Sequence, residues 1–403
     1  MIVAGDFGQL PPVNAKPLYS PDSTVSPIIH AKQSILDQKN TIGKIIWQQI
    51  TTVVILKQNM RQTAETADDV RFRTALTNMR FAACTNADLQ YLESRTISKR
   101  DNRPNFSNLE FRNVSIITAF NAPKDKINEL GSHKFAEETG QVLTSFYSND
   151  TVADNAGDSQ RKPKNVRGRQ TVKLKTTLPP NRQQQLWDAH PSFTETHIAG
   201  KLDLCVGLPV MIRNNEATEL CITKGQEGRV AGWTEATGNH DQRILDTLFV
   251  ELIDPPKTIQ VPDLPRNVVA ITKTSKKVWC MLPDDMSLQI TREQVLVLPN
   301  FAMTDYSSQG KTRAINVVDL NNCPNHFSYY TALSRSSTSA GTIILQGMDA
   351  HKITRGIHGS LRQEFRELEI LNEISRLRYE GDLPLTVRGW NRRELIRSFR
   401  VWK

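Results

Sequence analysis

The sequence predicts an α/β protein that carries a β-rich insertion, and three features of its 403 residues support this class. Near the start, an apolar run at residues 2–4 is predicted to be a buried strand, and it leads into the Asp, Gln and stiff Pro-Pro turn of residues 5–13. A strand–turn–helix order at residues 115–138 indicates the opening of a second α/β domain. Between residues 202 and 297, short apolar runs alternate with Gly and Pro turns, which is typical of a small barrel.

The remaining predicted elements follow from apolar periodicity and from capping residues. They are a buried strand at 52–56, helices at 67–81 and 86–94 (the second capped by Thr85), strands at 315–320 and 341–345, and a short helix at 327–336. Because α/β character lies on both sides of the β-rich region, the barrel is predicted to be an insertion within the second α/β domain.

Two basic regions stand outside this pattern. Residues 148–200 are polar and rich in Lys and Arg; a solvated insertion is the simplest interpretation, and a phosphate-contacting or nuclear-targeting segment is the alternative. Residues 361–378 form an amphipathic helix. The tail behind it interleaves Arg with Trp390 and Trp402, which suits single-stranded nucleic acid. The simpler interpretation is a solvated helix that packs both Trp side chains onto the body.

Composition favours a polyanionic partner, since the net charge is +9 and the pI is about 9.3. The five cysteines are scattered without a CxxC pair, so neither a metal site nor a disulfide framework is predicted, and a reduced intracellular compartment is expected. No apolar run approaches the roughly 18 residues of a membrane-spanning helix, and no signal peptide is recognisable. No membrane association is therefore expected.

The segment GDFGQLPPV at residues 5–13 resembles motif III of superfamily-one DNA helicases, in the form found in the PIF (petite integration frequency) type. The resemblance continues down the chain in the family's order. Residues 56–62 are similar to motif IV, 207–215 and 220–230 to the strand and Gly-rich turn at the family's barrel insertion, 302–312 to motif V, and 330–335 to motif VI. Motifs V and VI are most similar to the PIF-like helicases associated with Helitron-type transposons.

The resemblance implies a RecA-like P-loop helicase architecture and transfer of the ATP γ-phosphoryl group to water. The residues that it places at the nucleotide are Asp6, Gln9, Arg61, Gln309, Gly310 and Arg335. Gln9 would orient or sense the γ-phosphate, and Arg61 and Arg335 would act as arginine fingers, because a guanidinium bonds phosphate oxygens bidentately. Thr304 and Ser307 would bind the DNA backbone, although Tyr306-Ser307 departs from the family's usual His-Lys pair. ATP and Mg²⁺ are the cofactors of the intact family member, and single-stranded DNA is its partner.

The Walker A and Walker B motifs of such helicases precede motif III and are missing from these 403 residues. The sequence Gln309-Gly310-Lys311-Thr312 ends like Walker A, but residue 305 is Asp where that loop needs Gly, so no independent P-loop is predicted. The acidic pairs at 68–69 and 284–285 do not follow buried strands as Walker B does. The chain is therefore expected to be N-terminally truncated, and whether it binds nucleotide or hydrolyses ATP is left open.

The predicted organisation has four parts: residues 1–110 as a remnant of the first RecA-like domain, 111–205 with 295–350 as the second, 206–294 as the inserted small β-barrel, and 351–403 as an amphipathic helix and basic tail. The first hypothesis is an ATP-dependent 5′–3′ DNA helicase of recombination, repair, or telomere or transposon maintenance, in the nucleus. The second is a catalytically dead, nucleic-acid-binding remnant of a Helitron-type element. The third is an interaction protein that uses the helix at 361–378.

Overall fold

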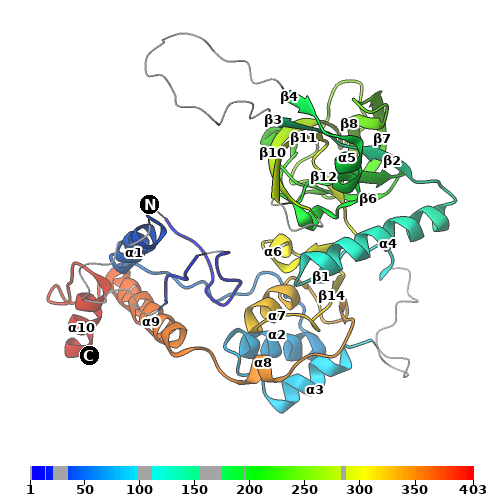
Figure 1. Cartoon of the computed structure of the whole chain (residues 1–403). Helices are drawn as coiled ribbons and strands as arrows, with labels where there is room; N and C mark the ends of the chain where they lie inside the picture. The colour runs from blue at the N-terminus through cyan, green and yellow to red at the C-terminus, as the bar shows by residue number, and fades with distance from the viewer. Residues whose placement is uncertain are drawn as a thin grey trace, which may run out of the picture. The chain divides into compact units, whose positions relative to one another are not determined.

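The computed structural model describes residues 2–13, 15–20, 35–97, 111–153, 175–194, 196–282 and 287–403. The chain divides into two compact units (Figure 1): unit 1 comprises residues 1–105 and 308–403, and unit 2 comprises residues 106–307. The division into four predicted domains stays a prediction, and each unit is described by itself below.

Unit 1 is mainly helical and holds a pair of short parallel strands (Figure 1). Its elements are α1 (Ile35–Gln48), α2 (Ala67–Arg80), α3 (Asn86–Ser94), β14 (Asn316–Val318), α7 (His326–Leu333), β15 (Thr342–Ile344), α8 (His351–Thr354), α9 (Gly359–Glu380) and α10 (Arg392–Trp402). Strand β14 is buried along its whole length and pairs with β15 from Asn316–Thr342 to Val318–Ile344. The apolar face of α2, which includes Phe72 and Met79, is fully buried.

Side-chain caps fix where the helices of unit 1 begin. Thr66 Oγ1 accepts a hydrogen bond from Asp69 N at 3.1 Å at the start of α2. Thr85 and Asp88 form a reciprocal capping box at the start of α3, with Asp88 Oδ2 accepting from Thr85 N at 2.8 Å. The helices predicted at 67–81, 86–94 and 361–378 are confirmed as α2, α3 and α9.

Unit 2 is β-rich, and its sheets are mostly antiparallel. Its elements are β1 (Ile116–Thr118), α4 (Asn121–Thr139), β2 (Thr144–Tyr147), β3 (Asn149–Ala153), β4 (Lys175–Thr177), α5 (Pro180–Asp188), β5 (Lys201–Leu204), β6 (Pro209–Ile212), β7 (Glu227–Thr237), β8 (Arg243–Leu252), β9 (Val268–Thr272), β10 (Thr274–Met281), β11 (Ser287–Gln294), β12 (Val297–Pro299) and β13 (Ala302–Thr304). The sheet orders are β12-β6-β7-β8-β9, β10-β11-β3-β4 and β2-β5, while β1 pairs with β13 in parallel.

The strand–helix connection of unit 2 is held by one amide and one glycine of α4. Asn128 Oδ1 accepts hydrogen bonds from the backbone N–H groups of Phe301 (2.9 Å) and Ala302 (2.8 Å), at the start of β13. A Cβ on Gly131 would lie 2.4 Å from Cγ of Phe301, so the close approach of that ring to α4 requires glycine. The region predicted as a barrel is β-rich as expected, and its closure into a barrel stays a prediction.

Two predicted buried strands are wrong. The apolar run at residues 2–4 is exposed and forms no strand, and Ile2 is 97 % exposed. Residues 52–56 are also outside any strand, and Leu56 is 90 % exposed. The backbone of this second segment instead follows α9, because Val53 N donates to Ser375 Oγ (3.0 Å) and Ile55 N to Asn372 Oδ1 (2.8 Å). The β-branched run lacks a neighbouring strand among the described residues, so it cannot bury both of its faces.

The polar segment at residues 148–200 is predicted to be a solvated insertion, but parts of it belong to the folded unit 2. Residues 149–153 and 175–177 are strands β3 and β4, and β3 pairs with β11. Asp150 is buried because Arg292 of β11 donates to both of its carboxylate oxygens, at 2.9 and 2.8 Å. The intervening basic residues at 154–174 lie outside the described residues, as does the acidic pair at 284–285. Tertiary pairing therefore overrides the low hydrophobicity of the described flanks.

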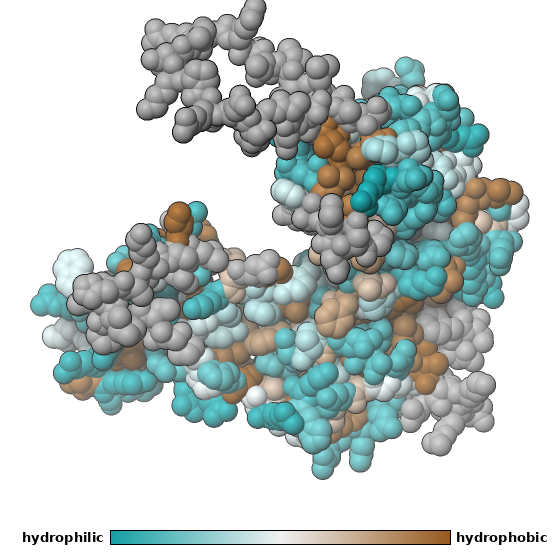
Figure 2. Space-filling model, in the orientation of Figure 1, coloured by the Kyte–Doolittle hydropathy of each residue, from teal (hydrophilic) through white to brown (hydrophobic). Residues whose placement is uncertain are grey.

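The C-terminal tail forms a helix as expected, but the prediction that both of its Trp side chains pack onto the body is wrong. Trp390 is 92 % exposed and Trp402 is 43 % exposed. Hydrophilic residues cover much of the visible described surface, with apolar patches between them (Figure 2). None of the described helices has the length and apolar character needed to cross a bilayer. The α/β fold class is confirmed by these elements.

Candidate functional site

The loop at residues 5–13 is a tight turn built on Asp6. Asp6 Oδ1 accepts a hydrogen bond from Gly8 N at 2.8 Å, and the Asp6 carbonyl accepts one from Gln9 N at 3.1 Å. Arg80, the last residue of α2, donates to Asp6 Oδ1 from Nε (3.1 Å) and Nη2 (2.7 Å). A Cβ on Gly8 would lie 2.6 Å from Cγ of Arg80, so glycine lets this side chain lie against the loop.

Arg80 also connects the loop to α9. Its guanidinium carbon lies 5.5 Å from the ring centre of Phe81 and 5.0 Å from that of Phe365, within the range of cation–π attraction. Sequence reasoning missed Arg80. Its position in the last turn of a predicted helix is an ordinary place for a basic residue, and nothing nearby in the sequence marks Asp6 as its partner.

The loop contacts the motif V segment through a pair of side-chain amides. Gln309 Nε2 donates to Gln9 Oε1 at 2.9 Å. Gly310 has φ +87°, a conformation that favours glycine, and Lys311 N donates to the Ser308 carbonyl at 3.1 Å to close the turn. Residues 311–315 after this turn form no helix, whereas a P-loop leads directly into one.

Arg61 joins the motif V and motif VI segments. Its Nε donates to Thr312 Oγ1 at 3.0 Å, and its Nη1 donates to the Ser334 carbonyl at 2.8 Å. The neighbouring Gln62 is buried, and its Nε2 donates to the Ser336 carbonyl at 2.7 Å. Segments that are about 250 residues apart in the sequence therefore meet at one place.

Arg335 is almost fully buried, with 1 % of its surface exposed. It follows the C-terminus of α7, and its Nε donates to the Thr331 carbonyl (2.9 Å) and its Nη2 to Ser334 Oγ (2.7 Å). In the described part of the chain, no carboxylate lies within ion-pair distance of it. Burial, together with the charge of Arg61, lowers the pKa of Arg335 to about 10. A buried guanidinium without a paired carboxylate is costly, which marks the position as a candidate anion site.

The phenol of Tyr330 is affected by the charges of several of these residues. Burial raises its pKa, and the charge of Asp6 acts in the same direction, while Arg80, Arg335 and Arg61 oppose them. The charges of three guanidinium groups and one carboxylate therefore all act on this side chain. We call Asp6, Gln9, Arg61, Arg80, Gln309, Tyr330 and Arg335 the arginine cluster.

The residues expected to contact DNA lie in unit 2 and bond to each other. Thr304, at the end of β13, donates from Oγ1 to Ser307 Oγ at 3.0 Å and accepts from Ser307 N at 3.3 Å. This arrangement caps the short helix α6 (Asp305–Ser308). Their role in DNA binding is a prediction that these contacts do not test.

Comparison with solved structures shows that the fold is similar to the RecA-like α/β fold of solved Pif1 helicases. The crystal structure of Pif1 helicase from Candida albicans matches at a TM-score of 0.52 and 17 % identity, over 78 % of this chain and 60 % of that chain. The crystal structure of Pif1 helicase from Bacteroides in complex with ADP-AlF3 and ssDNA matches at a TM-score of 0.54 and 16 % identity, over 94 % of this chain and 67 % of that chain.

At these identities the likeness shows the fold, and the chain spans 60 % of the Candida protein's length. No family model matches this sequence, and none of the curated proteins compared with it does. The predicted RecA-like helicase fold is therefore confirmed by structure alone, and the Helitron-associated branch and the N-terminal truncation stay predictions.

Proposed function

We propose that this chain is part of an ATP-dependent DNA helicase of the Pif1 type, and that the arginine cluster receives the terminal phosphate of a nucleoside triphosphate. The observation that carries the proposal is the convergence of motif III, IV, V and VI residues within unit 1, through the Gln9–Gln309, Arg61–Thr312 and Arg61–Ser334 hydrogen bonds. Helicase motifs are dispersed in sequence, so their meeting at a cationic cluster supports a shared ligand.

The donor set fits the phosphate end of a nucleotide. Arg61 and Arg335 offer guanidinium groups, which pair with phosphate oxygens in a fixed fork, and the Gln9 and Gln309 amides lie beside them. A bound triphosphate would supply the phosphoryl group whose spreading charge such cations stabilise. In this proposal, Gln9 orients the γ-phosphate and the two arginines neutralise it.

The residues present do not fit Mg²⁺. Among the described residues, no group of His, Cys, Asp or Glu could hold a metal ion, and Asp6 is already engaged by Arg80. We therefore assign no step to a metal in this chain. The Walker A and Walker B segments that would provide those ligands are missing from the 403 residues.

The finer parts of the proposal extend the resemblance. They are 5′–3′ unwinding in recombination, repair, or telomere or transposon maintenance, a Helitron-associated origin, a nuclear location, and contact of single-stranded DNA by Thr304 and Ser307. ADP-AlF3 and ssDNA are present in the Bacteroides Pif1 complex, which supports the same ligands here. A catalytically dead, DNA-binding remnant of a Helitron-type element is the second candidate function.

Tripolyphosphate tests the phosphate role without requiring turnover. It should raise the thermal unfolding midpoint of the purified chain, because a ligand that binds only the folded state stabilises it. The Arg335→Met variant should lose this shift, while Arg376→Met, which changes an exposed arginine of α9, should keep it. An equal shift in all three proteins would overturn the assignment.

The two candidate functions are separated by measuring ATP hydrolysis with and without single-stranded DNA. The proteins compared are the 403-residue chain and a fusion that adds the Walker segment of a Pif1 helicase upstream of it. The helicase proposal expects turnover in the fusion that Arg335→Ala removes. A fusion that binds nucleotide and DNA without hydrolysis would identify the remnant.

A further inference from the structure

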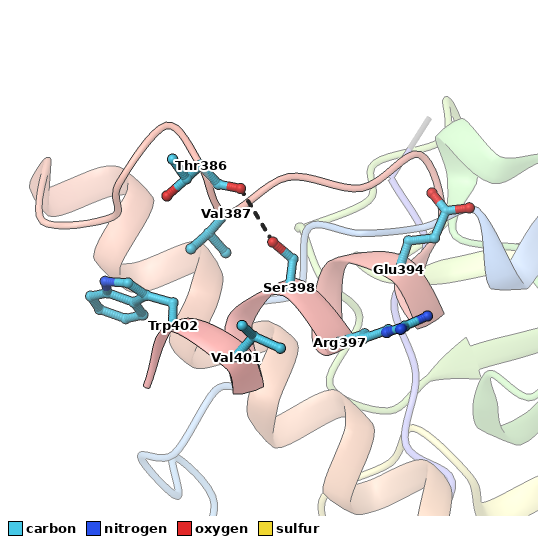
Figure 3. Close-up of a pocket in the computed structure, with 7 residues that line it drawn as sticks. All are labelled: Thr386, Val387, Glu394, Arg397, Ser398, Val401 and Trp402. Carbon is cyan, nitrogen blue, oxygen red and sulfur yellow. Dashed lines mark hydrogen bonds between the residues drawn. The ribbon is translucent and has the colours of Figure 1, made fainter.

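The C-terminal helix α10 and the loop before it enclose an open hollow of about 430 Å³ (Figure 3). Its apolar lining comes from Val387, Val401 and Trp402. The loop is fastened to the helix because Ser398 Oγ donates to the Thr386 carbonyl at 3.3 Å. The volume of the hollow is within the roughly 300–1,000 Å³ range of sites that bind small molecules.

The base of this region is rigid. Arg392 at the start of α10 is fully buried, and its Nη1 donates to Glu364 Oε1 of α9 at 2.7 Å. Leu395 and Phe399 pack against Leu371 and Ile374 of α9. The outer face of α10 is therefore held in a fixed position on unit 1, as a recognition surface requires.

The exposed face of the helix is cationic. Arg393, Arg397 and Arg400 recur at the spacing of one helix face, and Arg388 precedes them in the loop. All four are exposed, and none takes part in the ion pairs found between described residues. These positive charges are therefore accessible to solvent or to an anionic partner.

A tryptophan lies near each end of α10. Trp390, just before α10, is 92 % exposed, and Trp402, at its end, lines the hollow. A large aromatic side chain this exposed gains nothing from burial, whereas its free face can stack on a planar partner. The structure thus favours the interpretation in which the basic and aromatic residues of the tail contact single-stranded nucleic acid.

We propose that the outer face of α10 is a second contact site for single-stranded nucleic acid, separate from the helicase motifs. Bases stack on Trp390 and enter the hollow beside Trp402, while phosphates meet Arg393, Arg397 and Arg400. The exposed ring of Trp390 favours this partner over an acidic peptide, because bases offer planar faces for stacking and carboxylates do not. Arg397 lines the hollow and supplies a cation for a phosphate.

The test is the affinity of the 403-residue chain for a fluorescent oligothymidine, measured by anisotropy at low salt. Trp390→Ala should weaken binding by about five-fold or more, the scale of one stacked base. Arg397→Ala should weaken it by a similar factor, because it removes a phosphate contact. Tyr379→Ala and Arg378→Ala on α9 are matched controls, because both residues are exposed outside the hollow, and they should bind like the unaltered chain. Trp390→Phe should keep most of the affinity of the unaltered chain, because phenylalanine also offers a ring for stacking. The thermal melting curve of each variant should coincide with that of the unaltered chain.

The outcomes separate this proposal from the proposed function. If the unaltered chain binds the oligonucleotide and the α10 variants bind it equally well, the second site is wrong while the helicase proposal stands. If an abasic strand or polyglutamate binds as tightly as oligothymidine and loses as much affinity in the variants, the surface is a general polyanion or acidic-peptide site. Ultraviolet crosslinking of the oligonucleotide to the peptide containing Trp390 would support the proposal directly.

Discussion

Two buried arginines, one in each unit, should differ in how much the same substitution destabilises the fold around them. Arg292 is bonded to both carboxylate oxygens of Asp150 and to the Ile198 carbonyl at 2.9 Å. Arg335 bonds to neutral groups only, among the described residues, and shares its surroundings with Arg61. We expect Arg292→Met to unfold its unit more easily, whereas Arg335→Met should be nearly neutral.

The magnitudes follow from the environments. Arg292→Met leaves Asp150 buried without its partner, which costs about 3–5 kcal/mol. For Arg335, the pKa lowered to about 10 corresponds to a penalty of about 3 kcal/mol on the charged form in the folded chain. Because the folded pKa is lowered, this penalty is fully present below pH 10 and disappears as the pH rises above it. Its removal offsets the loss of two hydrogen bonds from a charged donor, which is about 3 kcal/mol in total at the lower end of their usual range.

Hydrogen exchange followed by mass spectrometry is the suitable assay, because a two-unit chain need not unfold in one step. Peptides from β11 report on Arg292, and peptides from α7 report on Arg335. Exchange in β11 should become faster by about a hundred-fold or more in Arg292→Met, while exchange in α7 should change by less than about ten-fold in Arg335→Met. The double variant Arg292→Met/Asp150→Leu should recover most of the loss.

This reasoning is refuted if α7 loses as much protection from hydrogen exchange in Arg335→Met as β11 loses in Arg292→Met. It would mean that Arg335 holds the fold together, and that its burial carries no information about a ligand. A neutral Arg292→Met would instead show that the Asp150 contact contributes little, and the contrast between the two arginines would be lost.

Further outcomes are expected for the chain as it stands. It should hydrolyse ATP at the background rate, and robust DNA-stimulated turnover of the pure protein would contradict this. Its affinity for single-stranded DNA should fall at least about ten-fold between about 50 and 200 mM salt, and salt-independent binding would contradict phosphate contacts. Asp6→Asn and Arg80→Leu should be non-additive by about 1 kcal/mol in a double-mutant cycle, and additive losses would remove this ion pair from the site. With a Walker segment restored, Arg335→Ala should lower turnover on the order of a thousand-fold with DNA affinity unchanged, and more than about a tenth of the parental rate would place Arg335 outside the site.

Local signals predicted the helices well, because their information lies within a few residues. The capping box at Thr85 and the apolar face of α9 mark elements without reference to the rest of the chain. The failures arose where a partner decides the outcome. Residues 2–4 and 52–56 have the composition of buried strands, but a strand needs a neighbour with which to pair. Ser375 and Asn372 of α9 bind the backbone of the second segment instead.

The residues of the candidate site also fall into two groups: those that the sequence predicts and one that only the fold reveals. Gln9, Arg61, Gln309 and Arg335 were predicted from motif resemblance, and the structure brings these four together. Arg80 belongs to the cluster but to none of the motifs, because its role comes from the space above Gly8 and from the charge of Asp6. Only the fold could show that a helix end meets this loop.

Arg80 also gives the cluster a physical connection to the C-terminal helices. It binds Asp6 in the Gln9 loop and lies over Phe365 of α9, while Arg392 of α10 binds Glu364 of the same helix. Neighbouring residues of one α9 turn therefore contact both Arg80, which binds the Gln9 loop, and the helix that we propose binds nucleic acid. Trp47 of α1 supplies a second link, because its ring lies 4.8 Å from the guanidinium carbon of Arg392 and 5.5 Å from the ring centre of Phe7 in the Gln9 loop. The sequence hid this link because each of its contacts joins residues that are far apart in the chain.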